Sequence, residues 1–114
     1  MPIEFYDNKE PISTDDDDCL VEIERVYCLD WHEFDDSHWK ELERIYMSLP
    51  GRVRYHSIPY WFGDDEDAPT YLWSSVEPPG LQVCGVLRAA DWRAWDEQFR
   101  SQADSLPSRD FDDE

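Results

Sequence analysis

Positively charged residues are scarce in this sequence. Its 114 residues include 10 Lys and Arg against 28 Asp and Glu, which gives a formal net charge of −18 at pH 7. Proteins bind nucleic acids largely through Lys and Arg side chains that neutralise phosphates, so direct binding of nucleic acid is not expected. The same field repels anionic lipid headgroups and attracts cationic surfaces. We therefore expect a basic protein partner and no membrane binding, with solubility alone as the other explanation of the acidity.

Cysteines and long apolar runs are also scarce. The three cysteines, Cys19, Cys28 and Cys84, form no CxxC pair, and their number is odd. This pattern favours a reducing compartment over a disulfide scaffold. No basic-then-apolar leader opens the chain, and no apolar run approaches 18 residues. We therefore expect a cytoplasmic protein.

Motifs that carry catalysis or bind cofactors are not found. The four glycines are scattered, so no Gly-rich phosphate loop is present, and no GxSxG motif occurs. His32 and His38 are six residues apart, which is not the spacing of an HExxH zinc site. Residues 64–67 lack the alternating acids of a calcium-binding loop. We therefore expect no enzyme activity, no cofactor and no metal site.

Aromatic residues, by contrast, are plentiful, with six Trp, six Tyr and five Phe. Disordered chains are poor in such residues, so the middle of the chain is expected to fold despite its charge. We predict a weakly ordered acidic arm over residues 1–18, with a possible edge strand at 3–6. A single α+β domain is predicted over residues 19–107, and an acidic tail over 108–114.

The apolar periodicity predicts the order of the strands and helices. Val21 and Ile23 alternate with two glutamates, which indicates a half-buried strand, and the phase shift after Arg25 indicates a bulge or burial on both faces. Two segments have the spacing of amphipathic helices. Strands are expected over 20–29, 52–58, 71–76 and 81–87, helices over about 36–49 and 91–106, and a loop over 59–69.

The resulting order is β-α-β-β-β-α. It predicts an α+β fold in which a four- or five-stranded, mainly antiparallel sheet carries two amphipathic helices on one face. The other face is then partly open to water or to a partner. Pro79 and Gly80 suit the central positions of a type II turn, which predicts a hairpin between the last two strands.

Aromatic residues beside acids supply the candidate binding site. Trp61 and Phe62 precede four consecutive acids, and aromatic anchors rimmed by charge are typical of protein–protein hot spots. In the alternative interpretation, these two rings close the end of the core. The candidate partner-binding residues are Asp35, Asp36, Trp61, Phe62, Asp64, Asp65, Glu66 and Asp67.

These features predict a small acidic protein-binding protein of the inhibitor or immunity type, which neutralises a basic partner such as a nuclease toxin. Acidic loops steer the association of such pairs. One alternative is a nucleic-acid mimic that inhibits a DNA-binding protein, which requires acids in regular rows. Another is a small ligand-binding or enzymatic domain without a recognisable motif.

Overall fold

The computed structural model describes residues 3–7, 18–53, 58–63 and 67–108 of the chain. In chain order, the elements within these residues are β1 (Phe5–Asp7), β2 (Leu20–Tyr27), the 3-10 helix η1 (Trp31–Glu33), α1 (Asp36–Ser48), β3 (Arg52–Val53), β4 (Tyr60–Trp61), β5 (Tyr71–Glu77), β6 (Gly80–Arg88) and α2 (Ala89–Ala103).

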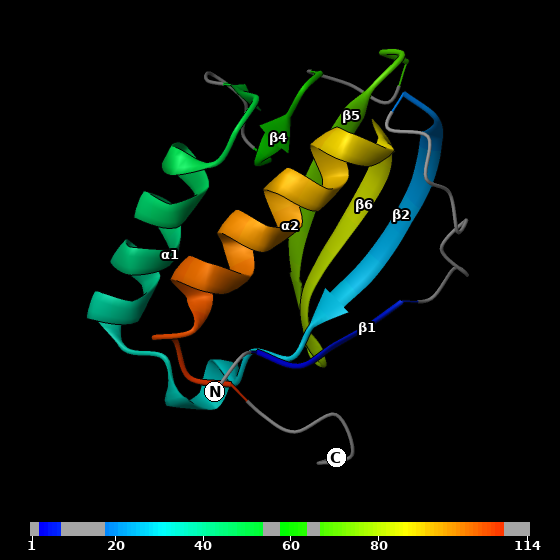
Figure 1. Ribbon diagram of the computed structural model, residues 1–114. Helices are drawn as coiled ribbons and strands as arrows, with labels where there is room; N and C mark the ends of the chain where they lie inside the picture. The colour runs from blue at the N-terminus through cyan, green and yellow to red at the C-terminus, as the bar shows by residue number, and fades with distance from the viewer. Residues whose placement is uncertain (1–2, 8–17, 54–57, 64–66, 109–114) are drawn as a thin grey trace.

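The strands of the described residues form one antiparallel sheet in the order β1-β2-β6-β5-β4-β3. Both helices lie on one face of this sheet, with α2 crossing over it and α1 beside α2 (Figure 1). The predicted α+β class and the placement of the helices are therefore confirmed. The sheet has six strands where four or five were predicted.

Strand β4 lies inside the segment 59–69, which the sequence predicted as a loop. Tyr60 lies opposite Trp73, and Trp61 lies opposite Leu72, so β4 extends the sheet beyond β5. The predicted strand over 52–58 begins as β3, and its residues 54–57 lie outside the described part of the chain. Strands of two residues have no alternation that a sequence pattern could reveal, which is why the loop prediction was wrong here.

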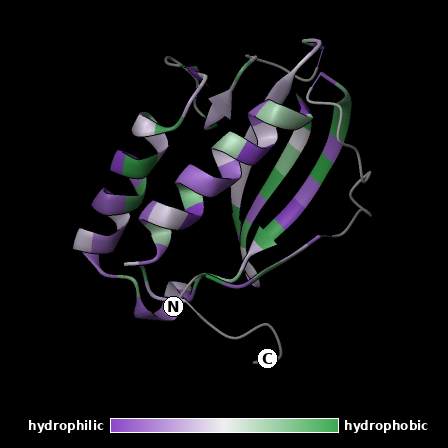
Figure 2. Cartoon of the chain, in the orientation of Figure 1, coloured by the Kyte–Doolittle hydropathy of each residue, from purple (hydrophilic) through white to green (hydrophobic). Residues whose placement is uncertain are grey.

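The pairing of β2 with β6 is unbroken from Leu20 opposite Arg88 to Tyr27 opposite Leu81. The phase shift after Arg25 is therefore no bulge. It reflects burial on both faces, because Arg25, Val26 and Tyr27 are all buried. Figure 2 shows hydrophobic and hydrophilic residues alternating along β2 before this point.

Helix α1 begins at a capping box. Asp35 accepts hydrogen bonds from the backbone N–H groups of Ser37 and His38, and the His38 Nδ1 atom accepts one from the Asp35 N–H. Such reciprocal bonds satisfy donors that the first turn leaves unpaired. The helix buries Leu42, Ile45 and Tyr46 toward the sheet.

Aromatic rings fill the centre of the core between the sheet and the helices. Trp95 of α2 stacks on Phe99, with 5.4 Å between the ring centroids, and meets Trp61 edge-on at 5.2 Å. All three rings are fully buried. Each removes roughly 150–250 Å² from water, so these few residues stabilise much of the fold.

The chain outside the predicted domain limits of 19–107 contributes to the same core. Ile3 is buried and belongs to the core cluster, and β1 pairs with β2 at the edge of the sheet. Ser108 forms an isolated bridge with Leu29. The exact limits of the domain stay a prediction. None of the helices in the described part of the chain is both long and apolar enough to cross a bilayer.

Candidate functional site

The two faces of the sheet differ in composition, and strand register determines which side chains share a face. Arg25 of β2 contacts α2, so Ile23 and Val21, two and four residues before it, face the helices as well. Glu22 and Glu24 therefore lie on the opposite face, which carries no helix among the described residues (Figure 1).

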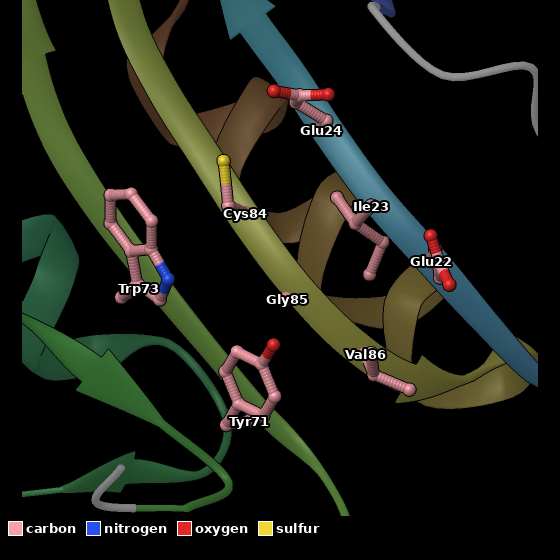
Figure 3. Close-up of a pocket in the computed structure, with 8 residues that line it drawn as sticks. All are labelled: Glu22, Ile23, Glu24, Tyr71, Trp73, Cys84, Gly85 and Val86. Carbon is pink, nitrogen blue, oxygen red and sulfur yellow. The ribbon is translucent and has the colours of Figure 1, made fainter. Parts of the chain in front are cut away.

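Two rows of side chains cross this second face. In the first row Trp73 of β5 lies opposite Cys84 of β6, which lies opposite Glu24 of β2. In the second row Tyr71, Val86 and Glu22 occupy the same three strands. Each row thus has an aromatic ring on β5, a smaller residue on β6 and a carboxylate on β2. Figure 3 shows the two rows side by side.

These six residues line a shallow groove of about 310 Å³, which we call the sheet groove. Gly85 lies on β6 between the two rows and also lines it (Figure 3). A Cβ atom at Gly85 would lie only 2.1 Å from the Tyr71 carbonyl oxygen, so glycine is required for the close pairing of β5 and β6 at this point.

The spacing of the strands suits a cationic group. Adjacent strands lie about 4.8 Å apart, so ring and carboxylate in each row stand about 10 Å apart, on either side of β6. A guanidinium or ammonium group that sits above the side chains over β6 is within reach of the carboxylate and of the ring face, which Figure 3 shows turned outward from the sheet. Ion pairing and the cation–π interaction then act on the same charge.

The structure places Trp61, a predicted partner-binding anchor, in the core. Its side chain is fully buried, and its indole N–H donates to the Tyr46 carbonyl oxygen at 3.2 Å. Its ring also meets Tyr46 edge-on. Trp61 is therefore a core residue, as the alternative interpretation expected, because β4 turns this side chain toward the helices.

The other predicted site residues do not come together. Phe62 is half-buried against the core and its N–H donates to the Gly51 carbonyl oxygen, just beyond the end of α1. Asp35 and Asp36 are exposed at the start of α1. The length of the helix, about 20 Å, separates them from Phe62 at its other end. Asp67 is exposed, and residues 64–66, which include Asp64, Asp65 and Glu66, lie outside the described residues.

Asp35 has a structural role in the capping box. The hydrogen bond from the Ser37 side chain, together with that from the His38 N–H, lowers the pKa of Asp35 below its usual value. The carboxylate is therefore engaged with its own helix. Asp36 lies in the first turn, where its negative charge interacts favourably with the positive end of the helix dipole.

A buried polar cluster links β1, β2 and α2. Arg25 donates to Asp7 at 2.8 Å and to Asp96 at 2.8 Å, and the Tyr27 hydroxyl donates to Asp96 at 2.7 Å. Arg100 also donates to Asp96. The two arginines and two aspartates balance each other in charge, which indicates a structural role for this cluster.

The same cluster shifts two pKa values. Burial lowers the pKa of Arg25, but its hydrogen bond to Asp7 and the nearby carboxylates outweigh that effect and hold the pKa above its usual value. Burial, together with the charge of Asp96, raises the pKa of Tyr27 well above its usual value. Arg25 is therefore charged and Tyr27 neutral throughout the physiological range.

Sequence reasoning did not select the residues of the sheet groove, although part of the signal was present. The alternation of Glu22 and Glu24 with apolar residues, and of Tyr71 and Trp73 along β5, places each pair on one face. The strand order brings the two pairs onto either side of β6, and it depends on the pairing of β2 with β6 across more than 50 residues of sequence. No local pattern reveals such pairings.

Within the residues that the structure describes, no three His, Cys, Asp or Glu side chains are grouped closely enough to hold a metal ion. His38 serves the capping box, and His32 is exposed in η1. The comparisons with known proteins add no relative: no protein-family model, no curated protein and no solved structure matches this chain.

Proposed function

We propose that this protein binds a basic protein partner through the sheet groove and neutralises it, as an inhibitor of the immunity type does. One observation carries the proposal. In a chain with a net charge of −18, the groove on the helix-free face pairs each carboxylate with an aromatic ring across a single strand. This arrangement matches the chemistry of a lysine or arginine side chain.

The size of the two rows favours a partner with two neighbouring cations. Glu22 and Glu24 are two residues apart on one strand, which separates their Cα atoms by about 6.8 Å. Basic residues at alternate positions of an extended segment, or one turn apart on a helix, have a similar spacing. Each cation would then occupy one row.

The overall charge supports the proposal through kinetics. A strongly negative surface steers a positive partner, which raises association rates by roughly 10- to 1000-fold at low ionic strength. The groove then supplies specific contacts, since aromatic side chains dominate the binding energy of protein interfaces. Steering and docking are therefore served by different parts of the molecule.

Co-expression with a toxin tests this function. The partner to use is a basic nuclease domain encoded by a gene adjacent to the gene of this protein, produced in a host whose growth it arrests. The wild-type protein is expected to restore growth and to form a complex that weakens as salt is added. A variant with Glu22→Arg and Glu24→Arg is expected to lose both properties.

The matched control carries Glu33→Arg and Glu97→Arg, which change the net charge equally at exposed positions of η1 and α2. This control is expected to keep the rescue of growth. Rescue by the groove variant, or equal loss in both variants, would show that net charge alone, or another surface, is responsible.

A further inference from the structure

A second hollow lies on the helix side of the sheet, between α1 and the strands β3 and β5. Its volume is about 450 Å³, within the range of small-molecule sites, and we call it the α1 cleft. Helix α1 contributes Trp39, Leu42 and Tyr46 to its walls, while Ser74 and Val76 of β5 face them across the cleft. It is thus separated from the sheet groove by the thickness of the sheet.

The mouth of the α1 cleft is apolar and exposed. Trp39 is 40% exposed and Val76 is 51% exposed, although both belong to the side of the sheet that the helices occupy. The Trp39 ring is held in place, since it stacks on Trp31 with 5.2 Å between centroids. A ligand with an apolar body would cover these two side chains and gain the free energy of their burial.

The inner end of the cleft is polar and incompletely paired. The Arg52 Nε and Ser74 Oγ atoms are both buried. The Arg52 Nε atom has no hydrogen-bond partner among the described residues, while the Ser74 hydroxyl lies close enough to the Tyr46 hydroxyl to affect its pKa. Leaving buried donors unpaired is costly. Within the described residues, the Arg52 guanidinium donates only to the main-chain carbonyls of Val53, at 3.0 Å, and Tyr60, at 3.3 Å.

The hydrogen-bond partners of Arg52 differ in kind from those of Arg25. Arg25 is paired with the carboxylates of Asp7 and Asp96. Burial lowers the pKa of Arg52, against the opposing influence of Tyr46 and Glu43. Among the described residues, the Arg52 guanidinium lies 5.4 Å from the Trp61 ring centroid and donates hydrogen bonds only to carbonyl oxygens. A partly desolvated guanidinium without a hydrogen-bonded carboxylate in this part of the chain suits the carboxylate of a ligand.

Two hydroxyl groups flank this cation. Burial raises the pKa of Tyr46 to about 12, although Ser74 and Arg52 act in the opposite direction, so its phenol keeps its proton at neutral pH. Ser74 supplies the second hydroxyl. A carboxylate beside Arg52 therefore meets a cation and two hydroxyl donors, the combination that recognises such a group.

We propose that the α1 cleft binds a small monocarboxylic acid with an apolar body. The carboxylate lies at Arg52 and Ser74, and the apolar body lies against Leu42, Trp39 and Val76. Glu43 also lines the cleft, and its charge disfavours a ligand with a second carboxylate. This site is independent of the protein partner, because it lies on the opposite side of the sheet.

The test uses 3-phenylpropionate as the probe and follows the Arg52 Nε–H signal in the NMR spectrum of the whole chain. The acid is expected to shift this signal saturably. The neutral analogue 3-phenylpropanamide is expected to bind about tenfold more weakly or worse, since it lacks the charge that Arg52 recognises. Phenylsuccinate, with two carboxylates, is expected to bind more weakly than the monoacid.

Arg52→Gln is expected to weaken binding of the acid about tenfold, whereas Arg44→Gln is expected to leave it unchanged. Arg44 is the matched control, because it is exposed on α1 and paired with Glu41. If Arg52→Gln does not fold, the proposal is tested by comparing the affinities of the acid and the amide for the wild-type protein. An unshifted Arg52 signal, or equal affinities for acid and amide, would overturn the proposal.

The groove variant with Glu22→Arg and Glu24→Arg is expected to bind the acid normally, which separates this test from that of the partner.

Discussion

Arg25 of β2 donates a hydrogen bond from Nη1 to the Asp96 Oδ1 atom of α2 at 2.8 Å, and both side chains are buried. This contact joins the sheet to the helix that covers it. The same carboxylate also accepts from Tyr27 and Arg100, so one aspartate satisfies three donors. Removing its charge leaves two guanidinium groups with less compensation.

Asp96→Asn is therefore expected to lower the free energy of unfolding by about 3 kcal/mol, because it keeps the side-chain volume but breaks a buried ion pair. Urea unfolding at neutral pH measures this change. Glu97→Gln is the matched control, since Glu97 is exposed on the next position of α2 and its loss is expected to change stability by less than about 0.5 kcal/mol. Similar losses in the two variants would contradict a structural role for the cluster.

Because the pKa of Tyr46 is raised in the folded state, the protein is expected to lose stability at alkaline pH. The folded state raises its pKa from 10.0 to about 12, so the folded protein keeps a proton that the unfolded chain has already released. The stability that this adds is complete below about pH 10 and is lost as pH rises to about 12. The loss amounts to about 3 kcal/mol.

Tyr46→Phe is expected to remove this contribution. Urea unfolding at pH 8 and at a series of values up to pH 12 measures the slope of stability against pH. The curve of the variant is expected to fall less steeply than that of the wild-type protein above pH 10. Two parallel curves would show that Tyr46 does not titrate as its burial requires.

Two tryptophans lie on opposite faces of the sheet, and replacing them is expected to change stability by different amounts. Trp61 is fully buried, so Trp61→Ala is expected to lower the free energy of unfolding by about 4 kcal/mol. Trp73 is half-buried on the helix-free face, so Trp73→Ala is expected to cost only about 1 kcal/mol. Denaturant unfolding of both variants measures these values.

The same pair distinguishes core from binding surface. Trp73→Ala is expected to weaken binding of a basic partner about tenfold, because it removes the ring that faces the cation. A Trp73→Ala protein that unfolds as easily as Trp61→Ala, or that binds the partner with full affinity, would argue against the sheet groove.

The long elements could be predicted from the sequence because each shows its own period over many residues. Strand β2 alternates from Val21 to Glu24, and α1 repeats its apolar positions between Trp39 and Leu49. The short strand β4 could not be predicted, since pairing with β3 and β5 creates it. For the same reason, the sequence pattern places Trp61 in a loop.

The hairpin between β5 and β6 was predicted correctly, but the residues of its turn were not. Glu77 pairs with Gly80, so the two loop residues are Pro78 and Pro79, not Pro79 and Gly80. Gly80 has a φ of 151°, and a Cβ atom there would lie 2.1 Å from the Tyr27 carbonyl oxygen. Glycine is thus required by the backbone of β2, a neighbour that the local sequence does not reveal.

The proposed function depends most on the sheet groove as the surface that binds cations. The most direct measurement is an NMR titration of the backbone and indole N–H signals with oligoarginine, at low salt and again at high salt. The largest shifts are expected at Glu22, Glu24 and the Trp73 indole, and they are expected to shrink as salt is added. Shifts spread evenly over the exposed acids of α1 and α2, with these signals unmoved, would contradict the proposed function.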